Sequence, residues 1–208
     1  MIKKIGWIIS AGKEAHIFSG EGEHGEIAIK IHRVQMVRFR KHRVYMRGDY
    51  RFDTAPLSGR KMYAVWARKE YRNLLKAYRA GVSVPKPIAI RENVVVMEFI
   101  GEDGLPAPLL KDAEVKNPEE LASRILNDVE KLYRESRLVH SDLSEYNIMY
   151  WRERHYIIDW SHAVAIDHPK AIEFLYHDVK AVTAFFNREY KVETPDAKEV
   201  VKRIVRGG

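Results

Sequence analysis

The chain has 208 residues, of which 46% are hydrophobic and 31% are charged, a composition typical of a soluble globular protein with its own core. Its apolar runs are too short to span a bilayer, and no secretory hydrophobic segment follows Met1. The absence of cysteine excludes a disulfide framework and a thiolate metal site. We therefore expect a cytoplasmic protein that has no membrane partner.

Most of the formal net charge of +7 lies in one segment. Residues 33–51 contain seven Lys or Arg and one acid, Asp49, so the segment carries +6. Phe39, Tyr45 and Tyr50 are interleaved with the basic residues, a pattern that indicates binding of a phosphate-rich partner. A solvated charged face is an equally good interpretation of this segment from sequence.

The first half of the chain predicts a small sheet with one helix. Alternating apolar residues between glycine-rich turns predict three strands before residue 33 and two more before the end of the first lobe. Apolar residues from Met62 to Tyr78 at helical spacing, closed by Gly81, predict a helix over residues 60–80. The predicted strands cover residues 5–10, 16–19, 26–31, 85–90 and 93–101.

The second half is predicted to be mainly helical. Asn117, Pro118 and Glu120 form a capping-box pattern at the start of a helix that runs to about Ser136. Thr194-Pro195 is expected to open a last short helix. Between these two helices the sequence predicts hairpin strands at 148–151 and 155–158 and an amphipathic helix at 170–187, with Ile172 on its apolar face.

This order of elements predicts an α+β protein with two lobes in one domain, residues 1–208. The N-lobe, residues 1–98, is an antiparallel five-stranded sheet with one helix. The C-lobe, residues 99–208, is small and mainly helical. The connection between them is expected near residues 98–102.

Five polar side chains match the requirements of phosphoryl transfer from a nucleotide. In "LVHSDLSEYNIMY" (138–150), Asp142 and Asn147 form H-x-D-x-x-x-x-N, and Asp159 ends the next strand. Asp142 suits the carboxylate that orients or deprotonates the nucleophile, and Asn147 and Asp159 suit Mg²⁺ ligands. Lys30 ends a strand where it can reach phosphates, and Glu70 lies mid-helix where it can pair with Lys30. Each match alone is as readily a turn residue or a surface pair, but their order on the expected elements favours the site.

A second interpretation of this region is a metallohydrolase. His140, His162, His168 and His177 lie close in sequence to several Asp residues. Histidine metal sites use short fixed spacings, and no such spacing connects these residues apart from the adjacent pair at 177–178. We therefore expect His140 to hold the catalytic loop by hydrogen bonding.

Several longer motifs together resemble the RIO family of atypical protein kinases, most closely its first branch, which lacks an N-terminal winged helix. They are "SAGKEAHIF", "GEIAIKIH", "WARKEYRNL", "VMEFIGEDGLPAPLLKD", "LVHSDLSEYNIMY" and "YIIDWSHAVAIDHPKAIEFLYHDV". The similarity runs from about residue 5 to residue 187. It implies a compact bilobal protein-kinase-like fold that binds ATP with Mg²⁺, or with Mn²⁺ in its place.

The resemblance also assigns roles to individual residues. Lys30, Asp142 and Asp159 take catalytic roles, Asn147 and Asp159 take metal-binding roles, and Glu70 pairs with the lysine. The loop "SAGKEA" has one glycine where three are usual, so side chains are expected to contribute to the phosphate contacts. The residues implied in nucleotide binding are Ser10, Lys13, Ile17, Ala28, Lys30, Glu70, Met97, Met149 and the backbone of Glu98 and Ile100. Trp160 replaces the phenylalanine of the familiar D-F-G and is expected to pack.

The family implies a serine/threonine kinase or ATPase that acts in maturation of the small ribosomal subunit. Its partners would be the pre-small-subunit particle, ribosomal RNA at residues 33–51 and a protein substrate. No A-P-E motif follows Asp159, which favours ATP hydrolysis or self-phosphorylation, with Thr54 and Ser58 as candidate acceptors. Two alternatives stay open from sequence: a small-molecule phosphotransferase of the aminoglycoside-kinase type, and a nucleotide-gated RNA-binding assembly factor with negligible turnover.

Overall fold

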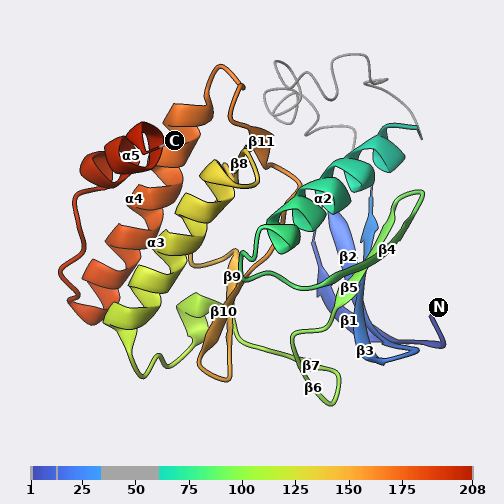
Figure 1. Ribbon diagram of the computed structural model, residues 1–208. Coiled ribbons are helices and arrows are strands. Elements are labelled where there is room, and N and C mark those ends of the chain that lie inside the picture. Colours follow the sequence, from blue (N-terminus) through green and yellow to red (C-terminus); the bar gives the residue numbers. More distant parts are fainter. Residues whose placement is uncertain (1, 13, 34–60, 208) are drawn as a thin grey trace.

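Five antiparallel strands form the sheet of the N-lobe (Figure 1). The computed structural model describes residues 2–12, 14–33 and 61–207, so Lys13, Thr54, Ser58 and all but Arg33 of the basic segment lie outside the described residues. The strands are β1 (Lys4–Ala11), β2 (Ala15–Gly22), β3 (Gly25–His32), β4 (Pro87–Arg91) and β5 (Val94–Glu98). They lie in the order β1-β2-β3-β5-β4, which confirms the predicted sheet.

The alternation in β3 gives the sheet two different faces. Ile27 and Ile29 are buried on one face together with Val96 of β5. Ala28 and Lys30 point to the other face, because successive side chains of a strand alternate.

A groove of about 1040 Å³ lies along β4 on the Ile27 face. Residues that line it include Ile27, Ala89, Val94 and Val96. The groove therefore lies across the sheet from Lys30 and is a separate feature from the polar residues of the predicted site.

Helix α2 (Lys61–Arg79) lies against the Lys30 face of the sheet (Figure 1). It buries Met62, Ala67, Leu74 and Ala77, which confirms the helix predicted over 60–80. Tyr78, which the pattern placed with these apolar residues, is exposed near the helix end.

The C-lobe is mainly helical, and in it α3 and α4 lie side by side and α5 lies against α4 (Figure 1). Buried residues such as Ile125, Val129, Leu175 and Phe186 form its core. Among the helices that the structure describes, none has both the length and the apolar character needed to cross a bilayer. The C-lobe elements are η1 (Leu110–Asp112), α3 (Pro118–Arg134), β8 (Leu138–Val139), β9 (Ile148–Trp151), β10 (Arg154–Ile157), β11 (Val164–Ala165), α4 (Ala171–Tyr190) and α5 (Ala197–Arg206).

The three predicted helices of the C-lobe are present, but three details of the predictions were wrong. The side chain of Asn117 makes no capping hydrogen bond; its carbonyl accepts from the Leu121 N–H, and Pro118 has no N–H to satisfy. The last helix is capped by Asp196, whose carboxylate accepts two backbone N–H groups, while the Thr194 hydroxyl donates to the Thr183 carbonyl. Ile172 is exposed on the outer side of α4.

A short hairpin of β6 (Gly101–Glu102) and β7 (Leu105–Pro106) follows the N-lobe sheet and was not predicted. The Trp7 indole N–H donates to the Gly104 carbonyl over 3.3 Å, and the Gly104 N–H donates to the Glu26 carboxylate. Gly104 has φ +74°, and a Cβ at this position would collide with the Trp7 ring. The hairpin is thereby held against β1 and β3.

A second junction joins the two lobes at Ser83, between α2 and β4. The Ser83 N–H donates to Asp128 Oδ2 of α3 over 2.8 Å, and the Ser83 carbonyl accepts from the Ile157 N–H over 2.8 Å. Asp128 is buried and also lies 2.9 Å from Nε2 of His155. Burial opposes ionisation, but the bonds from His155 and Ser83 outweigh it and lower the pKa of Asp128 to about 2.

Candidate active site

Lys30 joins the sheet, helix α2 and the C-lobe through two carboxylates. Its Nζ donates to Glu70 Oε1 over 2.7 Å and to Asp159 Oδ1 over 3.1 Å. The side chains of Lys30 and Glu70 are 9% and 2% exposed, whereas that of Asp159 is 36% exposed. Asp159 therefore combines a protein contact with free surface on which a ligand can bind.

Lys30, Glu70 and Asp159, here called the triad, keep one another in their charged forms. Burial alone would lower the pKa of Lys30, but Asp159 and Glu70 outweigh burial and hold this pKa above its ordinary value. Burial would likewise raise the pKa of both carboxyls, but Lys30 holds each below its ordinary range. Nε2 of His32 lies 2.8 Å from Glu70 Oε2, close enough for an ion pair although not aligned as a hydrogen bond. All three members are thus charged near neutral pH.

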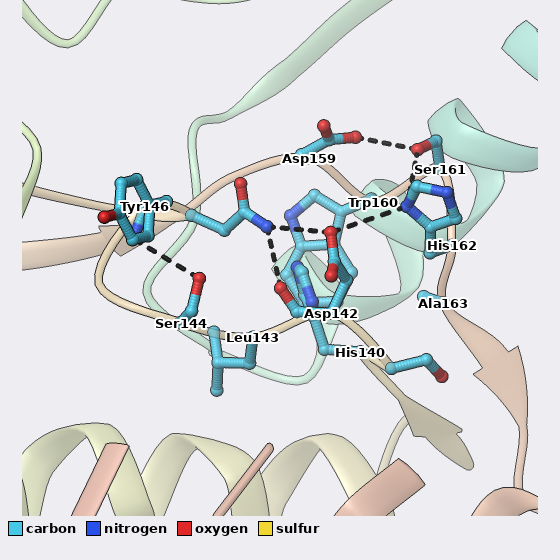
Figure 2. A network of polar contacts seen from close by, with 12 residues as sticks. His140, Asp142, Leu143, Ser144, Tyr146, Asp159, Trp160, Ser161, His162 and Ala163 are labelled. Atoms are coloured by element: carbon cyan, nitrogen blue, oxygen red, sulfur yellow. Dashed lines mark hydrogen bonds and ion pairs between the residues drawn. The ribbon is translucent and has the colours of Figure 1, made fainter. Parts of the chain in front are cut away.

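Asp142, which is labelled in Figure 2, forms the second half of the site together with Asn147. The Asn147 amide donates to the Asp142 carbonyl over 2.7 Å and to its Oδ2 over 3.2 Å, so its Oδ1 remains as the atom for a metal ion. Nδ1 of His162 lies 3.7 Å from Asp142 Oδ2, too far for a hydrogen bond. The Asp142 side chain is 54% exposed, which leaves it accessible to a substrate hydroxyl.

The pKa of Asp142 is raised above its ordinary value, first by partial burial and then by the nearby charge of Asp159. His162 and the bond from Asn147 act in the opposite direction. A carboxylate with a raised pKa is a better proton acceptor, as a general base requires.

The backbone around Asp142 is held from below by Asp178 of α4. Its carboxylate accepts the N–H groups of Ser141 and Leu143 over 2.8 and 2.9 Å. Burial raises the pKa of Asp178 to about 7, while these two bonds act in the opposite direction. Ser141 has φ +71°, an uncommon conformation for a non-glycine residue, so its turn depends on this support.

His140 connects the two halves of the site and confirms its predicted structural role. Its Nε2 lies 3.0 Å from the Ile158 carbonyl and therefore carries the proton. Burial lowers the pKa of His140 to about 4, so the ring is neutral at neutral pH. The ring stands edge-on to Trp160, which is buried as expected and donates from Nε1 to the Ile157 carbonyl (Figure 2).

The predicted nucleotide-binding residues of the sheet share the Lys30 face. Ser10 pairs with Ile17, and Ile17 pairs with Lys30; Ala28, two residues before Lys30, pairs with Met97. Directly opposed residues point to the same side of a sheet, so these side chains form one surface above the site.

The remaining predicted residues lie in the C-lobe or at the connection. Met149 is half-buried on β9. The Glu98 N–H already donates to Lys86, and the Ile100 carbonyl accepts from Ala107. An adenine at this connection would therefore use the Glu98 carbonyl and the Ile100 N–H. Lys13 lies outside the described residues.

The oxygen atoms of the site suit a hard divalent cation. Asp159 offers a partly exposed carboxylate and Asn147 an amide oxygen, the ligand types that Mg²⁺ prefers. Across residues 2–12, 14–33 and 61–207, no group of three or more His, Asp or Glu side chains is arranged to hold a metal ion. A cation here would complete its coordination with phosphate oxygens and water, as Mg²⁺ does in nucleotide sites.

Two polar residues of α2, Lys69 and Asn73, were missed by sequence reasoning. Both side chains donate to backbone carbonyls in the segment 160–163, directly after Asp159. A signal did exist, because both lie on the helix stripe that contains the buried Met62 and Ala77, where polar residues are unexpected.

A family model described as RIO domain matches residues 15–200. "Serine/threonine-protein kinase RIO1" of Caenorhabditis elegans is 40% identical over 201 residues, which are 95% of this chain and 40% of that protein. "RIO-type serine/threonine-protein kinase Rio1" of Thermoplasma acidophilum is 38% identical over 178 residues, 85% of this chain and 94% of that protein.

Among solved structures, the "Rio2 kinase-ADP/Mg2+-phosphoaspartate complex" from Chaetomium thermophilum is similar with a TM-score of 0.71 and 25% identity. The match covers 97% of this chain and 61% of that one. The chain thus spans about two fifths of the nematode relative and about three fifths of the fungal structure.

Proposed function

The chain belongs to the RIO family, and we propose that it is an ATP- and Mg²⁺-dependent serine/threonine kinase. The observation that carries this proposal is the bridge from Lys30 to both Glu70 and Asp159, with Asp142 and Asn147 beside it. Phosphoryl transfer needs these parts in one place, because its catalysis is mainly positioning and charge stabilisation.

Each residue has a distinct task in this mechanism. Lys30 is held as an ammonium by Glu70 and neutralises phosphate charge. Asp159 and Asn147 would hold Mg²⁺ through their side-chain oxygen atoms, and the ion would supply positive charge that neutralises the phosphates. Asp142 orients the acceptor hydroxyl and accepts its proton, and the bond from Asn147 fixes the carboxylate for this step.

We further propose that the protein acts in the cytoplasm on a small-subunit precursor, with ATP hydrolysis and self-phosphorylation as accompanying activities. Support comes from the +6 charge of residues 33–51, since basic side chains pair with RNA phosphates and interleaved aromatics stack on unpaired bases. The structure describes only Arg33 of this segment, so the proposal rests on composition and on family membership.

The direct test is incubation of the protein with labelled ATP and purified small-subunit precursors, followed by mapping of the label. Asp142→Ala is expected to abolish transfer while ATP binding is kept. Asp167→Ala, which changes an exposed carboxylate paired with Arg137, serves as the matched control and should retain transfer. A wild-type protein that binds ATP but neither transfers nor hydrolyses it would contradict the kinase proposal and favour a nucleotide-gated binding module.

The RNA contact has its own test. Reversing the charges of Arg38, Arg40 and Arg43 should weaken binding to precursor particles and reduce the salt dependence of the affinity. Unchanged affinity with an unchanged salt dependence would contradict the RNA contact and leave the kinase proposal intact.

A further inference from the structure

Helix α2 grips the segment after Asp159 at a place distinct from the Lys30–Glu70 pair. We propose that Lys69 and Asn73 are positioning residues that set the geometry of the metal-binding Asp159 carboxylate through the backbone of residues 160–163. This inference rests on the proposed function, because it assigns these residues to the metal site of the kinase. It adds a structural connection that the catalytic motifs do not contain.

Four hydrogen bonds make this connection. The Lys69 Nζ donates to the carbonyls of Ser161 and Ala163 over 2.8 and 2.6 Å. The Asn73 Nδ2 donates to the carbonyls of Trp160 and Ala163 over 3.1 and 3.0 Å. Residues four apart lie on the same face of a helix, so the two side chains act side by side on one segment.

The complete burial of the Lys69 and Asn73 side chains indicates a role beyond packing. Both residues are 0% exposed, and the Lys69 Nζ lies 5.3 Å from the centre of the Trp66 ring. Burying an ammonium is costly, and an apolar residue of similar volume at such a position is often neutral or stabilising. Packing alone would therefore be served at least as well by a methionine at position 69. What the lysine adds is a strong pair of bonds that fixes two carbonyls in space.

The fixed segment controls the Asp159 side chain through Ser161. The Ser161 hydroxyl donates to Asp159 Oδ1 over 2.8 Å, and the carbonyl of the same serine is held by Lys69 (Figure 2 shows the hydroxyl contact). Asp159 itself has φ +61°, a conformation that surrounding contacts must maintain. The bonds from α2 supply such contacts immediately after it.

Helix α2 consequently positions both Lys30 and its C-lobe partner Asp159. Glu70 positions Lys30, and the adjacent Lys69, together with Asn73, positions the partner of Lys30 on the C-lobe. Rotation of α2 away from the sheet would break the contact of Glu70 with Lys30, whereas the four carbonyl bonds tie α2 to the segment 160–163. The helix and the metal-binding segment are therefore expected to move as one unit.

The test measures metal binding directly. Asn73→Leu removes both amide donors with little change in volume, and Lys69→Met removes the ammonium. The probe is Mn²⁺, titrated by electron paramagnetic resonance into the protein with a non-hydrolysable ATP analogue. Affinity for the same analogue without metal is measured by fluorescence. Arg72→Ala, an exposed change in the same helix, is the control, and Asp159→Asn marks the loss of the metal ligand.

We expect Asn73→Leu and Lys69→Met to weaken Mn²⁺ binding by about tenfold, as loss of an outer-shell partner does, while metal-free analogue affinity changes less than about twofold. Arg72→Ala should match the wild type. If Lys69→Met does not fold, Asn73→Leu and Ser161→Ala carry the test, and Ser161→Ala should weaken Mn²⁺ binding in the same direction.

Two outcomes would overturn the inference in different ways. Wild-type Mn²⁺ affinity in Asn73→Leu, with binding lost in Asp159→Asn, refutes the positioning role and leaves the kinase site intact. Wild-type affinity in Asp159→Asn as well refutes the proposed metal site together with the inference.

Discussion

Removing the charge of Lys30 should destabilise the protein more than losing one surface ion pair would, and removing Glu70 as well should restore most of the loss. Breaking a buried pair costs about 3–5 kcal/mol, because the remaining charge is left without compensation. Glu70 is 2% exposed, but His32 stays 2.8 Å from its other oxygen. We therefore expect Lys30→Met to lower the free energy of unfolding by about 3 kcal/mol, at the lower end of that range.

In the double variant Lys30→Met/Glu70→Gln no carboxylate is buried at position 70. Its free energy of unfolding should lie within about 1 kcal/mol of the wild type, since an uncharged replacement of a buried pair is often neutral. Transfer activity should remain absent, because the ammonium that neutralises phosphate charge is gone. Stability and activity are thereby separated.

The pH dependence of the free energy of unfolding gives an independent check on the charge assigned to Glu70. In the wild type the pKa of Glu70 is lowered, so its contribution to stability is present above the unfolded pKa and is lost as pH falls through the folded pKa. In Lys30→Met, burial without Lys30 raises this pKa, so stability is greatest below about pH 4 and falls as pH rises through the folded pKa. The deficit of Lys30→Met should therefore grow from about pH 4 to about pH 7.

Urea unfolding, followed by the fluorescence of the four tryptophans, measures all three proteins at both pH values. The reasoning is refuted if Lys30→Met unfolds at the wild-type midpoint, or if Glu70→Gln fails to rescue it. A deficit that shrinks toward neutral pH would also contradict the assigned charge states.

Three further outcomes are expected. Asp142→Asn should lower kcat by about 100-fold or more without weakening metal-free nucleotide binding, because an amide cannot accept the proton. Single-turnover transfer and a fluorescent nucleotide titration measure the two quantities, and a kcat near that of the wild type would exclude Asp142 as the base. Gly104→Ala should lower the free energy of unfolding by about 1–3 kcal/mol, since φ is +74° and the new Cβ meets Trp7; an unchanged urea midpoint would contradict the described contact. Because the pKa of Asp128 is lowered to about 2, its contribution to stability is present above about pH 4 and is lost toward pH 2. Over this range the free energy of unfolding of the wild type should fall by about 2 kcal/mol more than that of Asp128→Asn, and identical acid-unfolding profiles would refute this.

The sheet could be predicted from sequence because its signals are local. The alternation of β3 and the glycines of the adjoining turn determine strand position and facing, and the structure has Ile27 and Ile29 on one side and Lys30 on the other. The pairing of Lys30 with Glu70 was predicted from the order of motifs rather than from any local pattern, and the two side chains do meet.

What could not be predicted is the identity of the partners of buried polar residues, even where the helix pattern marks such a residue as unexpected. Lys69 and Asn73 donate to backbone carbonyls more than 80 residues away. Every residue has a backbone carbonyl, so no residue type in the sequence marks the acceptors. Asp178 likewise supports the loop of Asp142 by accepting backbone N–H groups. At Asn117 the sequence pattern predicted a side-chain cap that the structure does not have. The Asn117 carbonyl accepts from the Leu121 N–H, but its side chain makes no capping hydrogen bond.

Ser83 is a fixed point between the two lobes of the protein. Both of its backbone groups are bonded to the C-lobe, through Asp128 and Ile157, and the residue lies four positions before the start of the edge strand β4. Any opening of the cleft that preserves these bonds is a swing about Ser83. Because β1 and β4 lie at opposite edges of the sheet, we expect such a swing to displace β1 more than the residues next to Ser83. Opening on the β1 side would then require the β6–β7 hairpin, which Gly104 ties to β1 and β3, to move with the sheet.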